Sequence, residues 1–276
     1  MLAALLALAA SASWGIGDFL GGVKSRTLHP LAIMAASQSV GLAALALWVG
    51  IRATAPPGPS VAWAVLSAGF GTVALGAFYR GMAVGAISIV APIAGAGAVI
   101  PVAVGLATGD NPSSLQEVGF ATAIGGVVLS SWERGPGRSR WASGAGFGVV
   151  AMVGFGFYFV FLHMASGHDY LWPAFLFRVT SVSLVLAALA LVRPAVTGIG
   201  GAWLVLAAIG FLDTGGNTFF AAASGHGSVS VTAVLASLYP VVTVLLARYH
   251  LHERVHRVQE LGIGLTIAGI VLVSAG

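Results

Sequence analysis

The sequence contains no cysteine and few charged residues, and both absences narrow what the protein can be. Without cysteine the chain can form no disulfide, has no thiolate nucleophile and offers no sulfur ligand to a metal ion. Only 7% of its 276 residues are charged, whereas a soluble domain carries about 25%. So few charges could not cover the surface of a water-soluble globule of this length. The composition therefore predicts an integral membrane protein with no soluble domain of any size.

Long apolar runs occupy most of the chain. Hydrophobic residues make up 58% of the sequence, and the mean hydropathy is +0.98. A helix that crosses a bilayer needs about 20 mostly apolar residues, and ten such segments with short connections nearly use up the chain. We predict an all-α integral membrane fold with ten transmembrane helices. Their expected ranges are 2–23, 30–51, 61–82, 86–107, 114–131, 143–164, 171–192, 202–223, 228–248 and 257–275.

The first of these ranges has some features of a signal peptide. No basic residue precedes its apolar run, however, and the run continues past Trp14 to Val23. We therefore interpret it as the first spanning helix.

Two segments that lie far apart in the chain repeat each other. Residues 116–131 (QEVGFATAIGGVVLSS) and 259–274 (QELGIGLTIAGIVLVS) are identical at eight of 16 positions. The shared Gln-Glu-x-Gly at the head of both segments is not explained by hydrophobicity alone. We predict two repeats of five helices each, at 1–131 and 142–276, joined by a central polar loop at 132–141.

An odd number of spans in each repeat has a geometric consequence. The second repeat has to enter the membrane from the opposite side, so the two halves are inverted relative to each other. Inverted repeats are a recurring architecture of secondary transporters, in which the substrate site lies near the midplane. The alternative is a duplicated membrane protein that transports nothing.

Short motifs recur at matching places in the two halves. A proline-containing helix is followed by a turn with an acidic residue and then by a helix that begins Gln-x-x-Gly. In the first half these motifs are Ile100-Pro101, Gly109-Asp110-Asn111 and Gln116-Glu117-Val118-Gly119. In the second half they are Tyr239-Pro240, His252-Glu253-Arg254 and Gln259-Glu260-Leu261-Gly262.

Together with Trp14-Gly15 in the first helix, these motifs resemble the EamA-type transporter family of the drug/metabolite transporter superfamily. Two positions depart from the family pattern, since Asp110 replaces the usual Glu and His252 the usual Gly. The resemblance covers nearly the whole chain. It implies a ten-helix transporter, not an enzyme, that moves small metabolites such as amino acids or drug-like compounds, commonly outward.

Charged residues inside predicted spans are the strongest candidates for function. A charge at the bilayer centre costs about 2.5–3.5 kcal/mol on insertion scales, so such groups usually face a cavity or a partner. Asp18 lies in the first helix and Asp213 near the middle of the eighth, with Asn217 one turn later on the same face. Either carboxylate could couple transport to protons or bind a substrate ammonium group. The alternative role is structural, as a hydrogen-bond partner for a neighbouring helix.

Two arginines are candidate partners for these carboxylates. Arg80 lies late in the third helix and Arg178 in the first two turns of the seventh. Each could pair with an aspartate or hold a substrate carboxylate through two hydrogen bonds. Each could equally extend toward lipid phosphates.

Aromatic residues and prolines complete the candidate site. Trp14, Tyr79 and Tyr158 could line a pathway, although such residues often form interfacial belts. Prolines inside spans remove backbone hydrogen bonds and are tolerated beside cavities. Paired interruptions in corresponding helices of two repeats indicate a transport site. We therefore expect the cavity to be surrounded by the predicted helices at 2–23, 61–82, 86–107, 143–164, 202–223 and 228–248. The helix breaks near this site are Pro92, Pro101 and Pro240.

The remaining features concern energy source and partners. No nucleotide-binding or catalytic motif is present, so we expect a gradient-driven monomer without cofactor or metal, with protons as one candidate coupling ion. The net charge of +4 comes from scattered basic residues, which favours lipid headgroups over nucleic acid as partners. We expect a multi-pass protein of the plasma membrane. A flippase for lipid-linked substrates and a non-transporting scaffold remain alternatives.

Two indications of the orientation of the termini disagree. The resemblance suggests cytoplasmic termini, which would leave only Arg52 in the cytoplasmic loops. Cytoplasmic loops normally carry the excess of basic residues, which favours external termini. The opposite loops would hold Lys24, Arg26, Arg134, Arg138, Arg140, Arg193, Arg248, Arg254 and Arg257.

Overall fold

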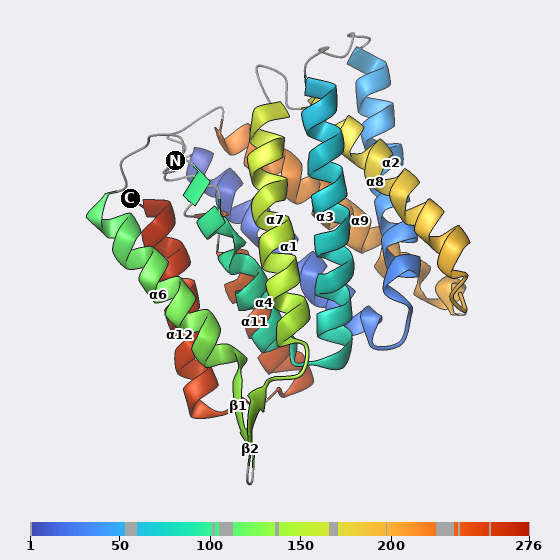
Figure 1. Cartoon of the computed structure of the whole chain (residues 1–276). Coiled ribbons are helices and arrows are strands. Elements are labelled where there is room, and N and C mark those ends of the chain that lie inside the picture. Colours follow the sequence, from blue (N-terminus) through green and yellow to red (C-terminus); the bar gives the residue numbers. More distant parts are fainter. Residues whose placement is uncertain are drawn as a thin grey trace.

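The protein is a bundle of long helices with one short β-hairpin, seen in a computed structural model (Figure 1). Both ends of the chain lie at the same end of the bundle, and the hairpin lies at the other. The structure describes residues 2–52, 60–100, 103–104, 113–135, 138–165, 171–196, 198–224, 235–236, 238–253 and 255–275.

The first half of the chain contributes three long helices followed by shorter ones. The long helices are α1 (Leu2–Ser25), α2 (Pro30–Arg52) and α3 (Ser60–Val84). They are followed by α4 (Ile87–Gly95), the 3-10 helix η1 (Ala96–Ala98) and α6 (Ser114–Ser131).

The second half begins after the hairpin. Strands β1 (Trp132–Gly135) and β2 (Arg138–Trp141) pair antiparallel. The helices that follow are α7 (Ala145–Ala165), α8 (Leu171–Val192), α9 (Ile199–Ser224), α11 (Tyr239–Leu251) and α12 (Arg257–Ala275).

Most expected helices appear within a few residues of their expected bounds. Six of them, α1, α2, α3, α7, α8 and α9, are long and apolar enough to cross a membrane. The helical membrane fold is therefore confirmed, while the count of ten spans stays a prediction. The structure differs from expectation in the central segment 132–141, which forms the hairpin and not a loop. The fourth range, expected as a span with breaks at Pro92 and Pro101, changes from α to 3-10 geometry at Ala96.

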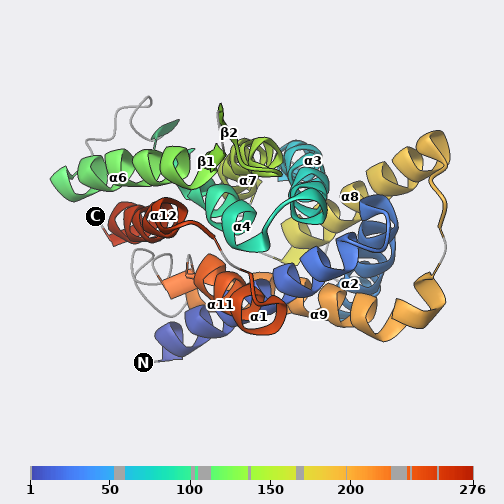
Figure 2. The same ribbon diagram turned by 90° about the horizontal axis from the view of Figure 1, so that it is seen from below.

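The helices pack in a regular pattern of partners. The most extensive contacts join α6 to α12, α3 to α7 and α1 to α9, and α2 packs on α8. Viewed from the hairpin end, α6 and α12 lie together at one flank, with α4 packed beside them (Figure 2). The packing is thus made largely between the two halves of the chain.

Glycines bring α6 and α12 into close contact. A Cβ atom on Gly126 would meet Thr266, and one on Gly269 would meet Ala123. A Cβ on Gly262 would meet Ser130. Rising residue numbers on α6 therefore face falling numbers on α12, so the two helices are antiparallel. Small residues are the usual means by which helices approach closely in a membrane.

Neighbouring glycines on α6 give a matched test of this packing. Gly126→Ala should lower the free energy of unfolding by about 1–3 kcal/mol, because overpacking forces the helices apart. Gly125→Ala should be neutral or stabilise by up to about 1 kcal/mol, because alanine favours helix and the space beside Gly125 is open. Thermal unfolding of both variants in the same detergent measures the difference. Equal shifts in the two variants would show that the α6–α12 contact is not close.

The repeated Gln-Glu-x-Gly motif has a structural explanation at the start of both helices. At α6, Gln116 Oε1 accepts a hydrogen bond from the Ser113 backbone N–H (3.0 Å), and Ser113 Oγ accepts one from the Gln116 N–H (3.2 Å). At α12, Gln259 Oε1 accepts from the His256 N–H (3.1 Å). Glutamine thus satisfies backbone groups that a helix start leaves without partners.

Glu253 connects three segments at the hairpin end of the bundle. Its carboxylate accepts hydrogen bonds from the backbone N–H groups of Ile87 (3.1 Å) and Ser88 (2.9 Å), at the start of α4. It also pairs with Arg26, in the α1–α2 connection, at 2.6 Å. The N-cap residue of α4, Ala86, offers no side-chain acceptor. Glu253 therefore supplies the cap from a distant part of the sequence, and we call these contacts the Glu253 clamp.

The turn that carries Glu253 shows why glycine is the usual residue of the family pattern at position 252. His252 ends α11 in a left-handed backbone conformation, with φ 53° and ψ 34°. Glycine adopts this conformation without steric cost and is the common residue at such helix ends. Histidine is tolerated here at the expense of some strain.

Candidate functional site

A cavity lies between seven helices near the middle of the bundle. It is bounded by α1, α2, α3, α7, α8, α9 and α11. Its polar lining residues are Asp18, Gln38, Arg178, Asp213 and Asn217. Its aromatic lining residues are Trp14, Phe155, Tyr158, Phe159, Phe177 and Tyr239.

A salt bridge in the cavity wall joins Arg178 on α8 to Asp213 on α9. The two side chains differ in exposure, with Arg178 only 3% exposed and Asp213 38% exposed. The Arg178 guanidinium also lies 5.7 Å from the centre of the Phe177 ring. Asp213 is therefore the member of the pair that faces open space, while Arg178 is held within the protein.

A buried polar network lies one helical turn beyond Arg178. Ser181 donates a hydrogen bond to the Oε1 atom of Gln38 on α2. The Ser181 and Thr72 hydroxyls are 2.7 Å apart, which adds α3 to the network. Hydrogen bonds between helices fix their relative positions in a membrane, where water does not compete for them. This network positions α8, and with it Arg178, beside the cavity.

Asp18 lies on α1 in the same cavity as Asp213. Here α1 packs directly on α9, and a Cβ on Gly17 would make an ordinary contact with the Cβ of Leu212, at 3.4 Å. Among the residues that the structure describes, no hydrogen-bond donor or cation pairs with the Asp18 carboxylate. The site therefore holds one carboxylate with a cationic partner and one without.

Aromatic rings form much of the cavity wall. The ring of Trp14 lies 5.8 Å from that of Phe220 and 6.2 Å from that of Tyr239, and the Tyr158 and Phe177 rings are 5.2 Å apart. Glycines make room for these rings. A Cβ on Gly216 would be 2.6 Å from the Trp14 indole, and one on Gly71 would be 3.0 Å from both Tyr158 and Phe177.

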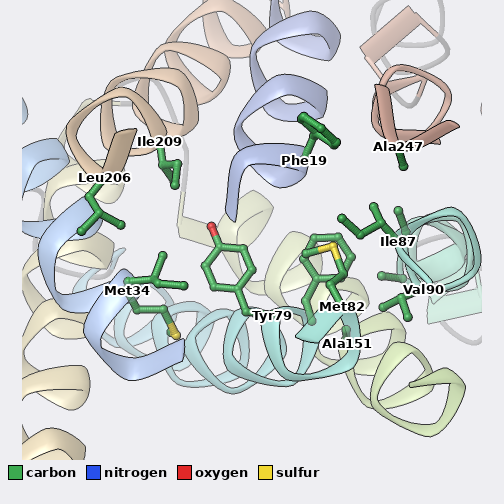
Figure 3. Close-up of a cluster of buried hydrophobic side chains, with 14 of the residues drawn as sticks. Phe19, Met34, Tyr79, Met82, Ile87, Val90, Ala151, Leu206, Ile209 and Ala247 are labelled. Atoms are coloured by element: carbon green, nitrogen blue, oxygen red, sulfur yellow. The ribbon is translucent and has the colours of Figure 1, made fainter. Parts of the chain in front are cut away.

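The cavity is closed on the side of the hairpin by tightly packed apolar residues. On the helices that line the cavity, these residues lie between the cavity-lining positions and the hairpin end of the bundle. Ile209, for example, precedes Asp213 on α9, and Met82 follows Leu75 on α3. We call this cluster the packed layer. It includes Phe19, Met34, Tyr79, Met82, Ile87, Val90, Leu206, Ile209 and Ala247 (Figure 3). Ala91 belongs to the same cluster.

Comparison with known proteins identifies the family. Residues 142–275 match the model of the EamA-like transporter family. Through these residues, the chain belongs to the EamA-like transporter family. The family is part of the drug/metabolite transporter superfamily. Together with the six apolar helices, this membership makes the chain a multi-pass membrane protein of a family that transports small solutes.

The fold of this EamA-like protein also occurs among solved structures. One, described as "Crystal structure of protein", superposes with a TM-score of 0.66 at 16% sequence identity, over 98% of this chain and 95% of the other. A likeness at that identity shows a shared fold and nothing of substrate. No curated protein matches the sequence.

The EamA-like cavity brings together six of the eight residues named from the sequence as binding or coupling candidates. These six are Trp14, Asp18, Tyr158, Arg178, Asp213 and Asn217. Tyr79 is 2% exposed within the packed layer, and its hydroxyl lies against Gly21 of α1. Arg80 is exposed on α3 and does not line the described cavity.

The prolines lie differently from expectation. Pro92 is inside α4 and buried, away from the described cavity lining. Pro240 is in the first turn of α11, where a helix needs no backbone N–H, and its place as a break within the expected span stays a prediction. Pro101 lies outside the described residues. Helices α2 and α8 line the cavity in place of α4, which was expected there.

Several lining residues of this EamA-like site were not recognised from the sequence. Phe155, Phe159 and Phe177 resemble the lipid-facing residues around them, so their sequence context carries no signal. Gln38 could have been found, because a polar amide in the middle of an apolar span needs a partner. Tyr239 was noted only as part of the Tyr-Pro motif.

Proposed function

We propose that this protein is a secondary transporter that exports small metabolites across the plasma membrane by alternating access. The observation that carries the proposal is the mid-bundle cavity, which combines the Arg178–Asp213 pair with the unpaired Asp18 carboxylate and is closed on one side by the packed layer. Charged groups at membrane depth are costly and usually mark a substrate or ion pathway. The cavity is formed within one chain, which supports a monomeric transport unit.

Alternating access needs two halves that can rock against each other. We propose that these halves are two inverted repeats of five helices each, which gives ten spans. Under this assignment α1 corresponds to α7, α3 to α9, α4 to α11 and α6 to α12. Packing partners then occur in matched pairs, since α1 packs on α9 as α7 packs on α3, and α1 on α11 as α7 on α4. The antiparallel contact of α6 with α12 supports inversion, because equivalent helices of inverted repeats run in opposite directions.

We further propose that the hairpin end faces the cytoplasm. The α1–α2, α8–α9 and α11–α12 connections lie at this end with the hairpin (Figure 1). Lys24, Arg26 and Arg193 belong to these connections or the adjoining helix ends. Basic residues near spans favour the cytoplasmic side. The conformation described here is then closed to the cytoplasm, and transport requires the packed layer and the Glu253 clamp to open.

The flippase alternative loses support from the position of the two arginines. A lipid-linked phosphate would need free basic groups in the cavity. Arg178 is paired with Asp213, and Arg80 is exposed outside the described cavity lining. The small-metabolite interpretation does not depend on either arginine being free.

Flux from proteoliposomes tests the proposed function. Vesicles are loaded with a mixed pool of amino acids, amines and other small metabolites, and the compounds lost with time are identified by mass spectrometry. The wild type should release a selected few, and Asp213→Asn should reduce their rate at least about tenfold, in line with the loss of a charged hydrogen bond. Asparagine keeps an oxygen acceptor for Arg178, so this variant is expected to fold.

The control is Glu117→Gln, which removes one negative charge from an exposed position on α6. It should transport like the wild type. If folded wild-type protein releases no compound selectively, with or without a pH gradient, the transporter proposal is wrong and a scaffold role is favoured.

A further inference from the structure

The charges of the cavity do not balance. Two carboxylates, Asp18 and Asp213, and one guanidinium, Arg178, line it. The salt bridge neutralises Asp213 and Arg178, which leaves Asp18 as the remaining acidic group among the described lining residues. A carboxylate near the middle of a membrane protein is costly without a partner. Since no described residue supplies one, the partner that best suits this position is a cation brought by the ligand.

The walls around Asp18 suit the rest of such a ligand. Trp14 precedes Asp18 by one turn on the same face of α1. Tyr239 packs against Trp14 by its edge, at 6.2 Å. Tyr158 and Phe177 form a second ring pair in the same cavity. Aromatic faces attract cations, and the attraction is strongest where water is excluded.

The same geometry disfavours a ligand that carries a carboxylate. Arg178 is the cation that would have to bind it, but this side chain is 3% exposed and already bound to Asp213. An incoming carboxylate would have to displace Asp213, and the cavity would then hold three carboxylates and one guanidinium. Anions and amino acids with a free carboxylate are therefore poor matches to the site.

We propose that the transported substrate is an organic cation: a protonated amine with a flat apolar body and no carboxylate. Its ammonium group binds Asp18, and its body lies between Trp14, Tyr158 and Phe177. This inference rests on the proposed transport function of the cavity and specifies the substrate class.

Three probes with the same phenyl ring test the inference: 2-phenylethylammonium, neutral 2-phenylethanol and anionic 3-phenylpropanoate. Binding to the purified full-length protein in nanodiscs is measured by calorimetry, and flux is measured in proteoliposomes. The cation should bind at least about tenfold more tightly than the other two, as expected for a desolvated ion pair with a cation–π contact. Equal or tighter binding of the neutral or anionic probe would overturn the inference.

Variants separate the role of Asp18 from effects on folding. Asp18→Asn should weaken binding of the cation at least about tenfold and leave the weak binding of the alcohol unchanged. Glu117→Gln, with the same charge change on α6, should bind like the wild type. Trp14→Leu provides a second variant, which should weaken the cation several-fold more than the alcohol. Undiminished cation binding in folded Asp18→Asn or in Trp14→Leu would contradict the proposal.

The flux experiment distinguishes failure of this inference from failure of the proposed function. Asp213-dependent release of anions or amino acids, with no release of the amine, would leave the transporter standing and overturn the cation assignment. Release of no compound at all would contradict both the transport function and the cation assignment.

Discussion

Asp213→Leu is expected to destabilise the protein by about 3–5 kcal/mol, far more than Arg178→Met. Removal of one member of a buried ion pair is costly because the other charge is left buried without a partner. In Asp213→Leu the group left behind is Arg178, which is 3% exposed and cannot reach water without a change in helix packing. In Arg178→Met the group left behind is Asp213, which is 38% exposed to the cavity.

Hydration explains the expected asymmetry. Water in the cavity can solvate the Asp213 carboxylate, so its pairing energy is closer to that of an exposed salt bridge, about 0–1 kcal/mol. Methionine fills much of the volume of the arginine side chain and adds no charge. The double variant Arg178→Met with Asp213→Leu buries no charge, and we expect it to recover most of the stability lost in Asp213→Leu.

Unfolding by sodium dodecyl sulfate in mixed micelles measures the three free energies, and proteoliposome flux is measured on the same samples. The double variant should be stable but inactive, which separates the structural from the functional role of the pair. If Asp213→Leu were no less stable than Arg178→Met, the assignment of Arg178 as the buried member would be wrong.

The sequence allowed the charged part of the site to be predicted because charges in a membrane are energetically costly. Asp18, Arg178 and Asp213 were named on that ground, and all three line the cavity. The same argument also selected Arg80, which is exposed on α3. Its neighbour Tyr79 is buried in the packed layer. Sequence position gives depth along a helix but not the direction of a side chain, and the nearly uniform apolarity of α3 provides no face by which to judge it.

The aromatic part of the cavity and the Glu253 clamp could not be predicted for a different reason. Both depend on contacts between segments far apart in the chain. Glu253 caps α4 from a position 165 residues after Ser88, and nothing near Ala86 indicates which distant residue supplies the cap. Phe177 becomes a lining residue through the packing of α8 against Gly71 of α3, beside Tyr158 of α7. Lipid-facing and cavity-facing phenylalanines look alike in the sequence.

Single cysteines offer a direct test of closure at the hairpin end, since the chain contains none of its own. A cysteine at Ala91, which is 0% exposed in the packed layer, should react with N-ethylmaleimide about 10 to 1,000 times more slowly than one at Asn217 in the cavity. This range follows from a minor open state populated at about 0.1–10%. Alanine at position 91 is close in size to cysteine, so Ala91→Cys should perturb packing little.

If transport requires the packed layer to open, the Glu253 clamp should control how often it opens. Its carboxylate joins the start of α4 to the α1–α2 connection. Glu253→Ala removes an acceptor of three charged hydrogen bonds, each worth about 1.5–3 kcal/mol where buried and less for the part-exposed Arg26. Labelling at Ala91→Cys should therefore become at least about tenfold faster in the Glu253→Ala background. Glu117→Ala serves as the control and should leave the rate unchanged.

The two rates have separate meanings for the mechanism. Equal labelling at Ala91→Cys and Asn217→Cys would show that water passes the packed layer freely, which excludes alternating access from this closed conformation. Slow labelling at Ala91→Cys that is insensitive to Glu253→Ala would show that the packed layer is a barrier. It would also show that the Glu253 clamp does not control the opening of this layer. Faster labelling in the presence of a transported compound would link opening to transport, because a ligand shifts a conformational equilibrium only through different affinity for its two states.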